Sequence, residues 1–178
     1  ADVKTLLVAN AAGGNQLAGV TAAPITITDV GAVSAADVKA IEENAATGLI
    51  TISSNATSLT GIRTDISHVL THDDKSVTDP EQITGSQALD LTVTDASITA
   101  VQQKALTDYS TGKITATISD TSNVELVKLV GTGHSLTIVA NDASIPATTL
   151  SGIDAVTTLP VTFGTTFGTI TGTAPDII

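Results

Sequence analysis

The chain has 178 residues and a formal net charge of −11, with 7 Lys and Arg against 18 Asp and Glu. This acidic balance excludes a nucleic-acid-binding surface, which needs clustered Lys and Arg. No apolar run reaches the ~18 to 20 residues of a membrane span, and none resembles a secretion signal. The chain contains 32 Thr but no Cys, Met or Trp, which predicts a strand-rich fold without disulfides, as in many extracellular repeat proteins.

The first clear unit spans residues 25–52. Residues 25–28 alternate Ile and Thr with period two, which predicts a half-buried strand that ends at Asp29. A capping-box pattern that starts at Ser34 predicts a helix over residues 34–46, and residues 49–52 predict a second strand. The expected apolar face of the helix consists of Val38, Ile41 and Ala45.

The richest polar segment runs from residue 65 to residue 81. If this segment is helical, two histidines lie one turn apart on one face, a spacing that suits zinc. The general-base Glu of a zinc-protease motif is missing, because the segment reads His-Val-Leu-Thr-His. The acids lack EF-hand spacing, so calcium stays an open alternative beside a solvated acidic loop that binds no metal. The candidate metal ligands are His68, His72, Asp73, Asp74, Asp79 and Glu81.

A second unit repeats the order of predicted elements in the first, which is strand, helix and strand. Residues 91–94 predict a strand that ends at Asp95, residues 99–110 a helix, and residues 113–118 another strand. Gly112, like Gly48 in the first unit, is expected to end a helix by adopting a positive φ. The expected apolar face of the second helix consists of Ile98, Val101, Ala105 and Tyr109.

A third unit begins with a strand at residues 136–138. Residues 142–147 then match residues 95–100 at five of six positions. Just before this unit, His134 follows Gly-Thr-Gly and is expected to be an exposed loop residue. Near the end of the chain, Phe163 and Phe167 are expected to plug the last coil; if exposed, they would mark the surface that receives another unit.

An Asp or Asn after each strand gives the spacing of the repeat. Most steps between these markers span ~22–26 residues, which is typical of solenoids. The sequence therefore predicts an α/β or mainly β solenoid of ~22–26-residue coils, with parallel strands and short helices. The spacing leaves open the coil assignment between His68 and Gln87. The repeated markers are Asp29, Asn55, Asp79, Asp95, Asp120 and Asp142.

The alternative fold is a β-sandwich adhesin domain, which needs about seven short strands and no three-turn helices. The two capped helix patterns favour the solenoid. We expect one repeat domain over residues 1–178, with units at about 1–24, 25–90, 91–135 and 136–178.

Several short motifs resemble those of a known group of proteins. Thr28-Asp29, Thr94-Asp95, Ser110-Thr111-Gly112 and the run Ile170-Thr171-Gly172-Thr173-Ala174-Pro175-Asp176-Ile177 resemble tandem repeats of giant secreted surface proteins of cyanobacteria and marine proteobacteria, hemolysin-type or adhesin-like. The likeness covers most of residues 25–178. It implies an extracellular structural or adhesive array, and it transfers no catalytic residue. The glycine-aspartate nonapeptides that bind calcium in many such proteins are absent from this sequence.

These observations predict a non-enzymatic structural or adhesive module on the cell surface or outside the cell. Its partners would be neighbouring repeats or identical subunits end to end, and surface glycans are a further candidate. One alternative is a self-assembling subunit of an extracellular filament or S-layer, because neither end resembles a polar cap. Another is a solenoid enzyme acting on polysaccharides, although no lysine or arginine recurs beside paired acids. No catalytic residue and no bound cofactor are expected.

Overall fold

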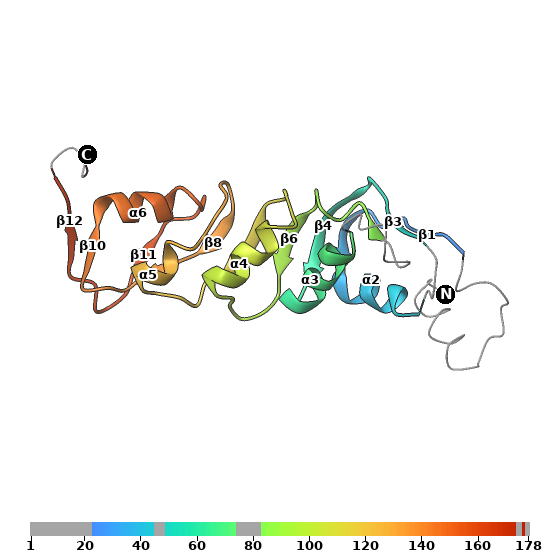
Figure 1. The fold of residues 1–178 in the computed structure, drawn as a ribbon, viewed down its shortest axis with the longest axis horizontal. Helices are drawn as coiled ribbons and strands as arrows, with labels where there is room; N and C mark the ends of the chain where they lie inside the picture. The colour runs from blue at the N-terminus through green and yellow to red at the C-terminus, as the bar shows by residue number, and fades with distance from the viewer. Residues whose placement is uncertain (1–22, 45–48, 74–82, 174–175, 177–178) are drawn as a thin grey trace. The chain divides into compact units, whose positions relative to one another are not determined.

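The computed structural model describes residues 23–44, 49–73, 83–173 and 176. The chain divides into two units, which are described separately. Unit 1 comprises Ala1–Val93 with Tyr109–Gly112, and unit 2 comprises Thr94–Asp108 with Lys113–Ile178. Both units are mixed α/β, with parallel strand pairs and short helices (Figure 1). The sandwich alternative is wrong, because its sheets would be antiparallel.

In its described residues, unit 1 contains two sets of parallel strands and two helices. One set pairs β1, β3 and β5, and the other pairs β2, β4 and β6. Helices α2 and α3 lie side by side against the second set (Figure 1). The elements are β1 (Ile25–Ile27), β2 (Gly31–Ser34), α2 (Ala35–Glu42), β3 (Ile50–Ile52), β4 (Ala56–Gly61), α3 (Arg63–His72), β5 (Ile83–Thr84) and β6 (Asp90–Val93).

Unit 2 has shorter strands and three helices. Strand β7 pairs with β8, β9 with β11, and β10 with β12, all in parallel. The elements are α4 (Ala100–Thr107), β7 (Ile114–Thr117), α5 (Asn123–Leu126), β8 (Ser135–Thr137), β9 (Val139–Ala140), β10 (Ser144–Pro146), α6 (Ala147–Asp154), β11 (Thr162–Phe163) and β12 (Thr169–Thr171). No helix in the described ranges of either unit combines the length and apolarity that a bilayer crossing requires.

The alternation of Ile and Thr explains the sheet of unit 1. Ile25 pairs with Ile50, which pairs in turn with Ile83, and all three side chains are buried. Thr26, Thr51 and Thr84 form the neighbouring row on the opposite face. Because successive strand residues point to opposite faces, this pattern gives each strand one apolar and one hydroxyl face. The predicted strand at residues 25–28 is therefore confirmed.

The helices begin where the capping patterns predicted. The Ser34 side chain accepts a hydrogen bond from the Asp37 amide at 3.3 Å. Thr99 and Gln102 form a complete capping box at the start of α4. In α2, Val38 and Ile41 are buried as expected, whereas the predicted Ala45 and Gly48 lie outside the described residues.

Most of the predicted apolar face of the second helix is wrong, although Ile98 is buried as expected. Val101 and Tyr109 are exposed, and the buried face consists of Ala100, Gln103 and Leu106 instead. The side-chain amide of Gln103 donates a hydrogen bond to the Val130 carbonyl and accepts one from the Val130 N–H, which satisfies this polar residue on the inner face of the helix. The role predicted for Gly112 is also wrong. Its φ is not positive, but a Cβ there would lie 1.9 Å from the Leu89 carbonyl oxygen.

Two of the acids that follow strands cap helices that lie earlier in the chain. Asp120 accepts a hydrogen bond from the Ala100 amide at 2.7 Å, at the first turn of α4. Asp142 accepts one from the Asn123 amide at the start of α5. Each acid therefore caps a helix whose start lies 20 or 19 residues before it in the chain. A carboxylate in this position also complements the positive end of the helix dipole.

The sequence step between register partners is not constant. Ile25 pairs with Ile50, but Ile50 pairs with the more distant Ile83, so the step that contains His68 is the longer of the two. In unit 2 the step is shortest between β7 and β8, longer between β9 and β11, and longest between β10 and β12. The predicted step of ~22–26 residues therefore fits only some of the strand pairs.

Candidate functional site

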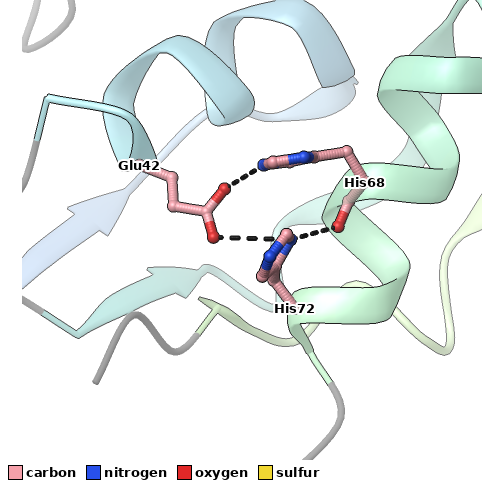
Figure 2. A group of neighbouring side chains, drawn as sticks. All are labelled: Glu42, His68 and His72. Carbon is pink, nitrogen blue, oxygen red and sulfur yellow. Dashed lines mark hydrogen bonds and ion pairs between the residues drawn. The ribbon is translucent and has the colours of Figure 1, made fainter. Parts of the chain in front are cut away.

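Three ionisable side chains meet between α2 and α3 in unit 1. Glu42 is the last residue of α2, and His68 and His72 lie one turn apart near the end of α3. Figure 2 shows the Glu42 carboxylate pointing toward both imidazole rings. One potential ligand atom from each residue lies within 4.8 Å of the others. We call Glu42, His68 and His72 the interhelix cluster.

The contacts within the interhelix cluster are polar and close. The Nε2 atom of His68 forms a hydrogen bond with Oε2 of Glu42, and Nδ1 of His72 lies 3.5 Å from Oε1. The two imidazole centroids are 4.2 Å apart, with the rings tilted by 48°. The Glu42 side chain is 2% exposed, whereas those of His68 and His72 are 26% and 28% exposed. The carboxylate therefore forms the floor of the cluster, and the imidazoles form its solvent side.

A second charged pair lies one turn away on the same two helices. Lys39 Nζ is 3.0 Å from Oδ1 of Asp65. The hydrogen bond that Lys39 donates to this carboxylate, and then the charge of the carboxylate, raise the pKa of Lys39 above its ordinary value of 10.5. Lys39 therefore stays charged at neutral pH. The Lys39–Asp65 and Glu42–His68 pairs are both separated by 26 residues in the sequence, so each residue of α2 in these pairs faces the residue of α3 that lies 26 positions later.

Asp73 is not part of this cluster. It is buried, and its Oδ2 accepts hydrogen bonds from the Ser86 amide, the Ser86 hydroxyl and the Gln87 amide, at 2.5, 2.6 and 3.1 Å. Asp73 thus anchors the segment before β6 to the end of α3. The remaining sequence candidates, Asp74, Asp79 and Glu81, lie outside the described residues, and calcium stays a prediction.

Sequence reasoning found the two histidines but missed Glu42. A signal for Glu42 was nevertheless present in the step between the markers Asp29 and Asn55. The same separation of 26 residues leads from Lys39 to Asp65 and from Glu42 to His68, which are their partners on α3. Complementary charges at both positions could have identified the facing helix surfaces.

His134 was expected to be exposed, and this prediction is wrong. The residue is 4% exposed, and its Nδ1 accepts a hydrogen bond from the Ile114 amide at 3.1 Å. Burial lowers the pKa of His134 below its ordinary value of 6.5, and the Val130 backbone opposes this shift. Gly131 is essential to this packing, since a Cβ there would lie 2.4 Å from Nε2 of His134. His134 therefore has a structural role in unit 2.

Comparison with known proteins gives no relative: no family model, curated protein or solved structure matches the chain. The resemblance to giant surface proteins stays a prediction. Two imidazoles and one carboxylate are a donor set that suits a transition-metal ion.

Proposed function

We propose that the chain is a non-enzymatic structural or adhesive repeat module of an extracellular or cell-surface protein. In this proposal, parallel coils stack within each unit as in a solenoid. The observation that carries it is the in-register row of Ile25, Ile50 and Ile83, which stacks like residues from successive coils. Each coil buries its neighbour's apolar face, which is the stabilising principle of repeat proteins.

The extracellular location is supported by composition. Without Cys and Met, the chain has no thiol or thioether to oxidise. The Thr-rich faces of the strands and the resemblance described above point the same way.

A test is protease treatment of intact cells that produce the protein, followed by immunodetection of the chain. We expect the intact cells to lose the signal while a cytoplasmic marker remains. A signal that disappears only after lysis would contradict the proposal.

The self-assembling alternative is supported by one end of unit 2. Ile145 on β10 is fully buried, but its register partner Ile170 on β12 is 41% exposed. Phe163 stacks on Phe167 and is itself 45% exposed, so it does not plug the coil. A hollow of about 330 Å³ lies between α6, β11 and β12. The row that is buried at Ile145 is therefore uncovered at Ile170, and an uncovered apolar row favours contact with a further coil. In this alternative, a second copy of the chain supplies that coil.

Solution mass across a concentration series tests this alternative, with and without calcium. Growth into long particles that Ile170→Thr reduces would support self-assembly. A monomer at every concentration would contradict it and leave the single-module proposal standing. No observation favours the polysaccharide-acting enzyme.

A further inference from the structure

We propose that the interhelix cluster binds a zinc ion that links α2 to α3. This inference does not depend on the proposed function. Its starting point is the donor set, which comes from two helices that are adjacent in space but belong to successive coils of the chain. Three ligand atoms within 4.8 Å of one another need only small side-chain adjustments to surround one ion bound at ~2.0–2.2 Å.

The burial of Glu42 favours a cation. A carboxylate that is 2% exposed carries a large desolvation cost unless positive charge lies beside it. In the metal-free protein, the hydrogen bond from His68 offsets part of this cost. A divalent ion would offset it further while leaving both imidazoles neutral.

The contacts of His72 favour its ligand form. Nδ1 lies 2.8 Å from the backbone carbonyl oxygen of His68, to which it donates a hydrogen bond. This bond fixes the tautomer that keeps a lone pair on Nε2, so the ring would present Nε2 to the ion while Nδ1, which also lies 3.5 Å from Oε1 of Glu42, keeps its proton. A backbone carbonyl that orients a histidine in this way is a common partner of metal-binding imidazoles.

The donor types select the ion. Two imidazole nitrogens and one carboxylate oxygen suit zinc, whereas calcium and magnesium prefer oxygen ligands. Since both imidazoles are about one-quarter exposed, water can reach the fourth coordination position. The ion would therefore join the last turn of α2 to the second half of α3, about one turn beyond the Lys39–Asp65 pair.

Calorimetric titration of the full chain with ZnCl2 tests the proposal, together with thermal unfolding at each zinc concentration. We expect one equivalent to bind and the melting temperature to rise with zinc and return after EDTA. His68→Ala and His72→Ala should each weaken binding at least tenfold, and Glu42→Gln should weaken it as well. His134→Asn removes the third histidine of the chain, which lies in unit 2, and should leave zinc binding unchanged.

Two further measurements make the test decisive. Co2+ should give the visible absorption bands of a low-coordinate nitrogen and oxygen site, and His72→Ala should abolish them even if Glu42→Gln does not fold. Ca2+ and Mg2+ should leave the melting temperature unchanged. Zinc binding of equal strength in the His68→Ala/His72→Ala chain would overturn the proposal, as would the absence of any zinc-dependent shift in the unchanged chain.

Discussion

Units 1 and 2 each bury a polar side chain on the inner face of a helix, and they partner it differently. Glu42 in unit 1 meets two ionisable imidazoles on the next helix of the chain. Gln103 in unit 2 is fully buried and meets the backbone of Val130, which follows α5. Its amide accepts from the Val130 N–H at 3.2 Å and donates to the Val130 carbonyl at 3.0 Å.

The contact of Glu42 in unit 1 can be strengthened by a bound ion, whereas the contact of Gln103 in unit 2 cannot. A neutral amide satisfies both backbone groups at any pH and binds no cation. A carboxylate beside two imidazoles offers three ligand atoms to a metal ion. Unit 1 therefore has an interface between helices that ions can strengthen, whereas the equivalent contact in unit 2 is constant.

The largest expected effect is at the other buried carboxylate of unit 1. Asp73→Ala removes the acceptor of three hydrogen bonds and leaves the Ser86 and Gln87 amides without it. We expect the free energy of unfolding to fall by about 3 kcal/mol or more. Chemical denaturation monitored by circular dichroism would measure this change.

Asp108→Ala is the matched control, because the Asp108 side chain is 53% exposed. It should change the free energy of unfolding by less than about 0.5 kcal/mol. If the two variants lost equal stability, Asp73 would not be the anchor that the structure describes.

Gln103→Ala should give the next largest effect. It leaves the amide and carbonyl of Val130 without their side-chain partner, at a cost of about 2 kcal/mol. Gln103→Glu restores the shape and the acceptor but not the donor, so it should recover little stability in denaturation at pH 7. Full recovery by Glu would show that the donated hydrogen bond contributes nothing.

Local sequence patterns predict part of the fold and part of the interhelix cluster, but they do not predict the buried polar contacts of Glu42 and Gln103. The capped helices, the Ile-Thr strands and the one-turn spacing of His68 and His72 follow from local patterns. The burial of Glu42 and Gln103 does not follow from local patterns, because the polar partner of each residue lies 26 or 27 residues further along the chain. The burial of His134 likewise depends on Gly131 and on the Ile114 amide, which local sequence does not connect.

The pH dependence of unit 2 should come from His134. Because its pKa is lowered in the folded chain, the unfolded chain takes up the proton first as the pH falls below 6.5. The contribution of neutral His134 to the free energy of unfolding is therefore complete above pH 6.5 and is lost as the pH falls through the pKa that His134 has in the folded chain. His134→Asn keeps an acceptor for Ile114 but cannot titrate, so its unfolding free energy should depend less steeply on pH between 7 and 5. Equal slopes in the two chains would contradict this role.

The smallest expected effect is at the Lys104–Asp108 pair on the surface of α4. The two side chains are about half exposed, and Nζ lies 2.7 Å from Oδ1. A double-mutant cycle with Ala at both positions should give a coupling of about 0.3 to 0.5 kcal/mol, which high salt abolishes. A coupling above about 1 kcal/mol would place this surface pair on a level with the buried contacts.

Disulfide trapping would test most directly the claim that successive coils stack in parallel register. The chain has no native Cys, so any disulfide must come from introduced residues. Thr26 and Thr51 are register partners on neighbouring strands, whose spacing of ~4.8 Å permits a disulfide. Thr26 and Thr84 are separated by two such spacings, which is too far.

We predict that Thr26→Cys/Thr51→Cys forms an intramolecular disulfide under mild oxidation, and that Thr26→Cys/Thr84→Cys does not. Preferential oxidation of the second pair, or failure of the first pair in a folded chain, would contradict the stacked-coil structure.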